Sequence, residues 1–260
     1  MRREFDMAGP DSKQPRAQPA QIAPGRGPRS PTLAVGGVTP LTTIDFPGEL
    51  AAVVFCQGCP WRCRYCQNGH LLQRTFRSEI AWQDVTGLLH RRRGLLDAVV
   101  FSGGEPTLQR GLPDAVGEVR ALGFKVGLHS AGCYPERLDE LLPAVDWVGL
   151  DIKALPQDYT ALTGVPGSGE RALESLDYLV ESGVPHEVRV TVHDALLPPD
   201  KLQRLIDLLV AHGAGEVILQ RCRTQHVLDP NLGDNTRPWQ QTARCTADQW
   251  RGGPLHAQGS

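Results

Sequence analysis

Short apolar runs alternate with longer amphipathic segments between residues 33 and 223 of this chain of 260 residues. The short runs have the length of buried strands, whereas apolar residues at intervals of three and four are typical of helices packed on a sheet. Six strands are predicted: Ala51–Phe55, Ala98–Phe101, Phe124–Leu128, Trp147–Leu150, Val188–Val192 and Glu216–Leu219. Five helices are predicted: Glu79–Arg92, Pro113–Leu122, Pro135–Leu142, Glu170–Glu181 and Pro199–His212.

This alternation indicates an α/β protein with a parallel sheet and right-handed crossovers. A barrel of six strand–helix units and a flat, doubly wound sheet both satisfy the pattern, because each unit needs about 30 residues. In either architecture, ligands bind at the carboxyl ends of the strands. The loops that follow the strands are therefore the places to look for functional residues.

The two ends of the chain depart from the pattern. Residues 1–32 are rich in Pro, Gly, Gln and Arg and are predicted to be a disordered leader, because they offer little to bury. Residues 33–223 form the predicted core domain, and residues 224–260 a C-terminal tail whose order the sequence leaves open.

Charge and cysteine content narrow the class of partner. The formal net charge is -2, which argues against a nucleic-acid partner. No apolar run approaches the roughly 18 residues of a membrane span, so no membrane partner is expected. Four of the seven cysteines crowd into residues 56–66, which is poor spacing for disulfides and natural for metal ligation. We therefore expect a reduced, cytoplasmic protein.

The cysteine cluster follows the first predicted strand. Cys59, Cys63 and Cys66 form a Cys-x3-Cys-x2-Cys run, and three such thiolates can bind three corners of an iron–sulfur cube while the fourth iron stays open. Adding Cys56 gives four thiolates, which also suit tetrahedral zinc. Zinc sites usually gather ligand pairs from separated loops, so the iron–sulfur interpretation is favoured and Cys56 is expected to be a small buried residue.

Other polar residues lie where later strands end. Gly103 and Gly104 end the second strand, where glycine allows close approach of the backbone to a ligand. Asp151 and Lys153 follow the fourth strand, and the alternative there is a surface ion pair worth little. Arg189, on the fifth strand, has a guanidinium that suits a carboxylate ligand.

The cysteine run, with Tyr65 just before Cys66, resembles the cluster loop of the radical SAM superfamily. The segment Gly103-Gly104-Glu105-Pro106 resembles the Gly-Gly-Glu-Pro motif of the same superfamily. The resemblance implies a partial (βα)6 radical SAM barrel with parallel strands, and a [4Fe–4S] cluster and SAM as cofactors. It implies these roles: Cys59, Cys63 and Cys66 as cluster ligands, Tyr65 near the adenine, and Gly103, Gly104 and Glu105 at the amino group of S-adenosylmethionine (SAM). With SAM as the ligand, Arg189 is expected to reach its carboxylate.

Asp151-x-Lys153 resembles a pair found in activases of glycyl radical enzymes, which implies that both side chains hold the polar end of SAM. Residues 36–48 and 56–63 resemble the activating protein of anaerobic ribonucleoside-triphosphate reductase. One departure is His129-Ser130-Ala131-Gly132, where activases of the pyruvate formate-lyase type tend to show Asp-Thr-Asn-Gly. The acidic contribution to a cation site is therefore not expected here.

The function that this resemblance implies is that of a radical SAM oxidoreductase. An electron donor such as flavodoxin or ferredoxin would reduce the cluster, SAM would be cleaved to a 5′-deoxyadenosyl radical, and that radical would create a glycyl radical on the anaerobic reductase. No side chain is expected to be catalytic beyond the cluster and SAM. Two alternatives remain: a radical SAM enzyme acting on a small molecule such as a modified-base precursor, and a non-catalytic binding module stabilised by zinc.

Overall fold

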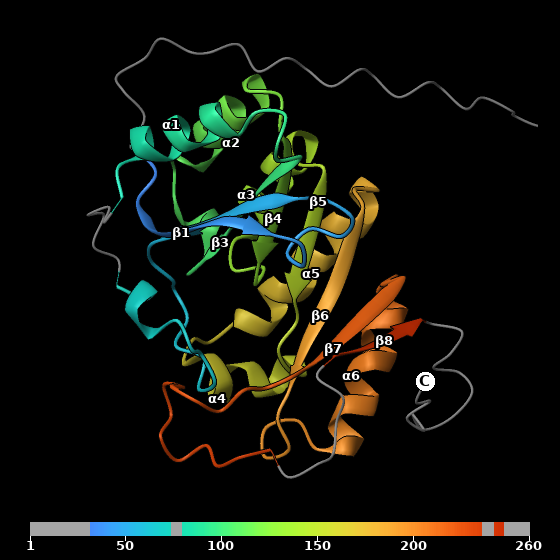
Figure 1. Ribbon diagram of the computed structural model, residues 1–260. Helices are drawn as coiled ribbons and strands as arrows, with labels where there is room; N and C mark the ends of the chain where they lie inside the picture. Colours follow the sequence, from blue (N-terminus) through green and yellow to red (C-terminus); the bar gives the residue numbers. More distant parts are fainter. Residues whose placement is uncertain (1–31, 74–79, 236–241, 247–260) are drawn as a thin grey trace, which may run out of the picture.

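The computed structural model of the protein describes residues 32–73, 80–235 and 242–246. Its described strands form one sheet of eight, in the order in which they occur along the chain (Figure 1). The strands are β1 (Val35–Thr42), β2 (Ala51–Cys56), β3 (Ala98–Gly103), β4 (Lys125–Ser130), β5 (Trp147–Asp151), β6 (His186–Val192), β7 (Glu216–Arg221) and β8 (Thr242–Thr246). The α-helices are α1 (Trp82–Arg92), α2 (Leu112–Ala121), α3 (Pro135–Leu141), α4 (Tyr159–Thr163), α5 (Ser168–Ser182) and α6 (Pro199–Ala211).

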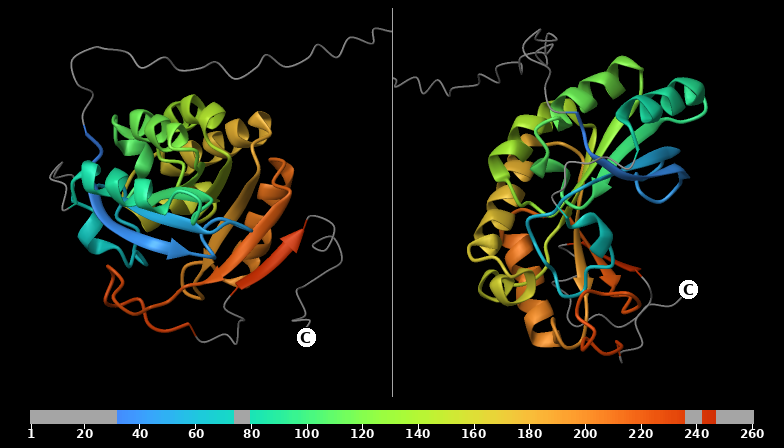
Figure 2. Two further views of the ribbon diagram at one scale, coloured as in Figure 1. Left: turned by 45° about the horizontal axis from the view of Figure 1, so that its top comes forward. Right: turned by 90° about the vertical axis from the view of Figure 1, so that its left-hand side faces the viewer.

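The strand order distinguishes the two architectures that the sequence allowed. Strands β2 to β7 pair in parallel and in sequence order, whereas a doubly wound sheet reverses its order at a switch point. Right-handed crossovers between successive neighbours leave the helices on one face of the sheet. Figure 2 shows these helices along the convex side of a curved sheet. The fold is thus an α/β partial barrel with six parallel strands, as predicted.

Two strands at the sheet edges were not predicted. Strand β1 pairs antiparallel with β2, and β8 pairs antiparallel with β7. The sequence of β1 contains two glycines and a proline, so it shows no regular alternation of apolar residues. Its pairing with β2 is also irregular, with two shifts of register. Strand β8 is five residues of mainly polar sequence, and α4 is a helix of five residues, too short for a helical period to appear.

Each parallel strand packs a different layer on each of its faces. One face packs on the helices in the main core, with residues such as Val54, Phe101 and Leu150 fully buried. The other face lines the interior of the partial barrel. Its lower part holds a separate apolar cluster, here called the floor, formed by Phe46, Ala51, Val53, Ala98, Val100 and Trp147.

Two large aromatic rings fill the floor because small residues surround them. Phe46, in the turn between β1 and β2, stacks on Trp147 with ring centroids 5.4 Å apart. A Cβ on Gly127 would lie 2.9 Å from Phe46 Cδ1, so the absence of a side chain at this position in β4 is what admits the ring. The barrel interior is therefore filled at the amino ends of the strands, opposite the edge where the strands end.

The predicted leader, apart from Thr32, lies outside the described residues, as does the start of the helix predicted from Glu79. Part of the predicted C-terminal tail is described. Residues 224–235, here called the strap, run beside the loop that follows β2 (Figure 1), and β8 extends the sheet. None of the described helices is long and apolar enough to cross a bilayer.

Candidate functional site at the carboxyl edge

The cysteine loop leaves β2 at the carboxyl edge, and its first half lies between two other segments. On one side the Gly58 N–H donates to the Leu71 carbonyl at 2.7 Å, and the Cys59 N–H donates to the Leu72 carbonyl at 3.5 Å. On the other side the Glu105 N–H donates to the Gly58 carbonyl at 2.9 Å. The position of Cys59 thus depends on backbone contacts with residues that follow it and with the end of β3.

The second half of the loop is held by different parts of the chain. The Arg62 N–H donates to Thr163 at the end of α4 at 2.8 Å, and the Leu228 N–H of the strap donates to the Cys66 carbonyl at 3.1 Å. The Arg64 side chain forms an ion pair with Asp229 of the strap at 2.7 Å. Cys63 and Cys66 therefore depend on contacts that Cys59 does not share.

The four cysteines of this region differ in burial. Cys56, the last residue of β2, is fully buried, and burial raises the pKa of its thiol. Cys63 is a buried member of the same core at 7% exposure, whereas Cys59 and Cys66 are partly exposed and pack against it. Burial raises the pKa of Cys59 to about 12 and of Cys63 to about 11, so their thiolates need a bound cation to be stable.

The donor set fits an iron–sulfur cluster better than a single ion. Within the described ranges, no group of three or more His, Cys, Asp or Glu side chains is arranged to hold one metal ion. An iron–sulfur cluster makes a different demand, because each thiolate binds a separate iron. Three thiols on one loop at the carboxyl edge meet that demand.

Tyr65 lies inside the loop. Its side chain is buried, and its hydroxyl has no hydrogen-bond partner within the described part of the protein. Burial raises the pKa of this hydroxyl well above its usual value, so it is neutral. Lys153 Nζ lies 5.9 Å from the centre of the Tyr65 ring, in the range of a cation–π contact. A buried donor without a partner is a group that a polar ligand would satisfy.

The two glycines at the end of β3 pack against the cysteine loop. A Cβ on Gly103 would lie 2.5 Å from the Cys56 nitrogen, and one on Gly104 would lie 2.2 Å from the Gly58 oxygen. Gly103 also has a φ of 112°, which other residues rarely adopt. The structure thus gives these glycines a local reason that the sequence did not reveal: backbone packs on backbone to hold the start of the cysteine loop.

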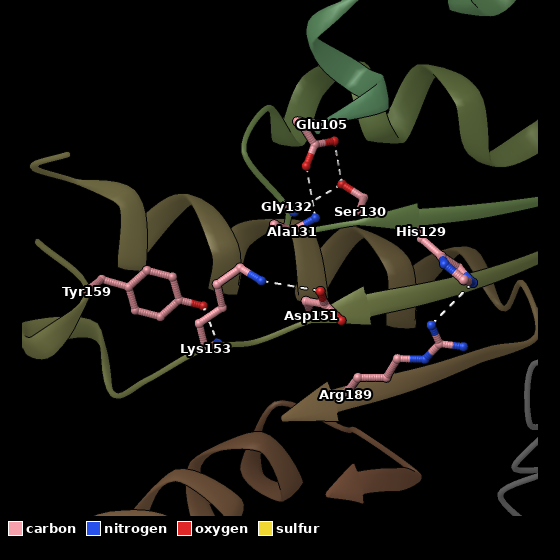
Figure 3. Close-up of polar contacts among 9 residues, drawn as sticks. All are labelled: Glu105, His129, Ser130, Ala131, Gly132, Asp151, Lys153, Tyr159 and Arg189. Carbon is pink, nitrogen blue, oxygen red and sulfur yellow. Dashed lines mark hydrogen bonds and ion pairs between the residues drawn. The ribbon is translucent and has the colours of Figure 1, made fainter. Parts of the chain in front are cut away.

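Glu105 is fully buried and links the ends of β3 and β4 (Figure 3). Its Oε1 accepts hydrogen bonds from the Thr107 hydroxyl at 2.6 Å and the Ser130 hydroxyl at 2.8 Å, and its Oε2 accepts one from the Ala131 N–H at 2.9 Å. Ser130 and Ala131 belong to the segment that departs from the Asp-Thr-Asn-Gly pattern. In this chain the segment binds a carboxylate instead of supplying one.

Asp151 and Lys153 come together at the end of β5. Lys153 Nζ lies 3.2 Å from Asp151 Oδ2, and the Lys153 N–H donates to the Tyr159 hydroxyl at 2.8 Å (Figure 3). Burial alone would lower the pKa of Lys153, but the charge of Asp151 raises it well above its usual value. The lysine side chain is 11% exposed and the aspartate side chain 41%, so this is not an ordinary surface pair. Tyr159, in the short α4, is a residue that the sequence did not single out.

Arg189 points away from Lys153. Its side chain runs back toward His129 (Figure 3), where Nη1 lies 3.2 Å from His129 Nε2, and its guanidinium stacks over Trp147 at 5.0 Å. An ion pair with Glu187 at 3.5 Å completes the arrangement. Burial, and then the charge of Arg189, lower the pKa of His129 to about 4, so its ring is neutral. Arg189 thus lies on the floor side, apart from the other predicted SAM contacts.

A loop of cysteines at the carboxyl edge of a partial (βα)6 barrel defines a class of protein. Residues 53–219 match the Radical SAM superfamily, and the chain belongs to that superfamily. It is therefore a radical SAM enzyme, with a [4Fe–4S] cluster and SAM as the cofactors of its family. Membership of this superfamily favours the iron–sulfur interpretation of the cysteines over the alternative of a zinc-stabilised binding module.

Within the superfamily, the chain is homologous to activating enzymes of glycyl radical enzymes. It is 33% identical over 170 residues to a Methanocaldococcus jannaschii protein named as a glycyl-radical enzyme activating enzyme, covering 60% of this chain and 67% of that one. It is 30% identical over 192 residues to the pyruvate formate-lyase-activating enzyme of Listeria monocytogenes, covering 67% of this chain and 75% of the other.

Solved structures support the fold. SuiB of Streptococcus suis bound to S-adenosylmethionine superposes with a TM-score of 0.54 over 66% of this chain and 40% of SuiB, at 16% identity. The HemN coproporphyrinogen III oxidase of Escherichia coli, itself described as a radical SAM enzyme, gives a TM-score of 0.51 over 69% of this chain and 46% of HemN, at 12% identity. At such identities the likeness concerns architecture alone.

Proposed function

We propose that this protein activates a glycyl radical enzyme, and that its target is anaerobic ribonucleoside-triphosphate reductase. The observation that carries the proposal is the homology to activating enzymes, which extends over 170 residues in one relative and 192 in the other. The target rests on the likeness of residues 36–48 and 56–63 to the activating protein of that reductase. The proposed setting is the reducing cytoplasm, with flavodoxin or ferredoxin as the electron donor.

We assign the cluster to Cys59, Cys63 and Cys66. Their thiols lie on one loop at the edge where ligands bind in such barrels, while Cys56 is still part of β2 and is fully buried. When bound, the cluster supplies the electron that cleaves SAM into methionine and the 5′-deoxyadenosyl radical, which removes a hydrogen atom from a glycine Cα.

The other residues of the edge bind and orient SAM in this proposal. Lys153 and Asp151 face its carboxylate and amino groups, and Tyr65 lies beside its adenine. The backbone of Gly103 and Gly104 and the carboxylate of Glu105 take up the amino group, with Oε2 of Glu105 the less occupied oxygen. Arg189 needs a different rotamer to join them, because its guanidinium now contacts His129 and Glu187.

The closed floor supports entry of a protein loop from the carboxyl edge. Phe46 and Trp147 occupy the barrel interior at the opposite end. A glycine Cα can then reach the site only if the partner extends a flexible loop into the open edge.

Electron paramagnetic resonance tests the proposal. The reduced protein is mixed anaerobically with SAM and the candidate reductase, and a doublet from one α-hydrogen is expected. The doublet should be absent when the reductase glycine is replaced by alanine, and absent with the Cys59→Ser variant. If SAM is cleaved but no cognate glycyl radical enzyme gives the doublet, the proposal fails and the small-molecule alternative takes its place.

A further inference from the structure

Two glutamine side chains are buried beside the cysteine loop, and none of the roles above uses them. Gln57 is 8% exposed and Gln109, which follows β3 and the turn after it, is 4% exposed. A buried amide is stable only when its polar atoms are hydrogen-bonded, so the partners of these two side chains show what they hold together.

Both amides bond to backbone. Gln109 Nε2 donates to the Ala34 carbonyl at 2.7 Å and to the Gln57 carbonyl at 2.9 Å, and its Oε1 accepts the Ala34 N–H at 2.6 Å. Gln57 Nε2 donates to the His70 carbonyl at 3.2 Å and to the Gln73 carbonyl at 3.0 Å. We call this set of contacts the amide brace. It joins the start of the cysteine loop to residues 70–73, which follow the loop, and to the residue before β1.

Gly36 makes room for the brace. A Cβ there would lie 2.6 Å from Gln57 Oε1 and 2.4 Å from Leu71 Cδ2, closer than real contacts allow. The next residue, Gly37, has no such constraint: its Cβ would meet only the Phe55 side chain, at 3.6 Å. Neither glycine has a positive φ, so alanine at either position disturbs side chains and not the backbone.

The brace bears on one of the three proposed cluster ligands. Cys63 and Cys66 are held through α4 and the strap, whereas Cys59 follows Gln57 by two residues and its own N–H makes only a long contact of 3.5 Å. Loosening the brace would therefore release the first ligand and leave the other two in place.

We propose that Gln57, fixed by Gln109 and by the space at Gly36, is a positioning residue that sets Cys59 for cluster binding before any iron is present. This inference rests on the ligand assignment made in the proposed function. It connects two separate sequence segments, Gly36-Gly37 and Cys56-Gln57-Gly58-Cys59, because the space at Gly36 admits the side chain of Gln57.

The test compares Gly36→Ala with Gly37→Ala in the full chain after anaerobic reconstitution. Iron release to a chelator is measured with iron and sulfide content. Because partners outside the ligand set typically change metal affinity about 10- to 100-fold, Gly36→Ala should release iron at least about tenfold faster than the wild type. Gly37→Ala should match the wild type. Equal release by the two variants would overturn the proposal.

Amide hydrogen exchange of the iron-free protein gives a readout that does not depend on the cluster. The amides of residues 56–59 should exchange slowly in the wild type and in Gly37→Ala, and faster in Gly36→Ala. Fast exchange in the wild type would show that the loop is not set before iron binds, and would refute the idea.

A second variant, Gln57→Ala alone, covers the case in which Gly36→Ala does not fold. It removes the two hydrogen bonds that the Gln57 amide donates and adds no atom beside Leu71, so it should fold and still release iron rapidly. Retention of iron at the wild-type rate would contradict the role of the amide. Cys59→Ser, measured alongside, separates the two ideas: a normal cluster in that variant defeats the ligand assignment itself.

Discussion

The two ends of the barrel are built by different physical means. At the carboxyl edge, segments distant in sequence are joined by hydrogen bonds to backbone, as in the contacts of Glu105 and of the amide brace. At the floor, Phe46 and Trp147 are held by size, in spaces left by small residues such as Gly127. The edge depends on the identity of polar atoms and the floor on volume, so substitutions should affect chemistry at one end and stability at the other.

The largest expected effect on chemistry at the carboxyl edge comes from substitution of the cysteines. Cys59→Ser, Cys63→Ser and Cys66→Ser should each abolish cluster-dependent SAM cleavage, because a thiolate that binds iron is lost. Cys56→Ser should retain most of the cleavage, since Cys56 lies in the main core. Iron content and 5′-deoxyadenosine formation measure the effect. An equal loss at Cys56 would indicate a site of four thiolates.

Phe46→Ala, at the floor, should reduce the stability of the protein and leave SAM cleavage intact. Removing a buried phenyl ring costs about 3 kcal/mol of unfolding free energy, while the reconstituted variant should still cleave SAM. Urea unfolding measures the loss. Ile44→Ala is the matched control in the same turn, because Ile44 is 83% exposed and should change stability by no more than about 0.5 kcal/mol. Similar losses in the two variants would mean that Phe46 does not fill the floor.

Asp151→Ala and Lys153→Ala should weaken SAM binding by roughly 1–3 kcal/mol, the usual cost of leaving a charged partner unpaired. Calorimetry on the reconstituted protein measures the affinity, and the cluster spectrum should be unchanged. Lys201→Ala is the control, since Lys201 forms an ion pair of 2.8 Å with Asp158 and neither residue has a proposed role in SAM binding. Normal SAM affinity in both edge variants would show that Asp151 and Lys153 do not bind SAM.

The smallest expected effect is the contribution of His129 to the pH dependence of the unfolding free energy. Its folded-state pKa of about 4 lies below the unfolded value of about 6.5, so below pH 6.5 the unfolded chain binds the proton first. Stability is therefore lost as pH falls from about 6.5 toward 4. Between pH 7 and 5, the iron-free wild type should lose about 1–2 kcal/mol more than His129→Gln does. Parallel losses in urea unfolding would show that His129 is not buried as a neutral ring.

The sequence predicted the edge better than the floor for a physical reason. Cys59, Gly103 and Asp151 each follow an apolar run, and the ends of parallel strands meet at one edge, so local patterns were enough to group them. The contact between Phe46 and Trp147 depends on the register of β4 and β5 and on a gap at Gly127, none of which a local pattern records. The sequence also did not show that the closest neighbours of Gly103 and Gly104 are backbone atoms of the cysteine loop.

The edge strands escaped prediction for a similar reason. Strand β1 carries Gly36, which leaves room for Gln57, and its two glycines hide its strand character. The strap was left open because its contacts with Arg64 and Cys66 join residues about two-thirds of the chain apart. Only the folded chain brings them together.

That separation along the chain determines the order in which these contacts can form during synthesis. The amide brace spans 75 residues at most, so it can form once Gln109 has left the ribosome. The strap meets the cysteine loop across 165 residues, so Cys66 lacks one of its anchors until Asp229 has also been released. The first ligand is thus prepared early and the last one late. Iron delivered to a nascent chain would find half a binding site, whereas iron delivered after release would find all of it.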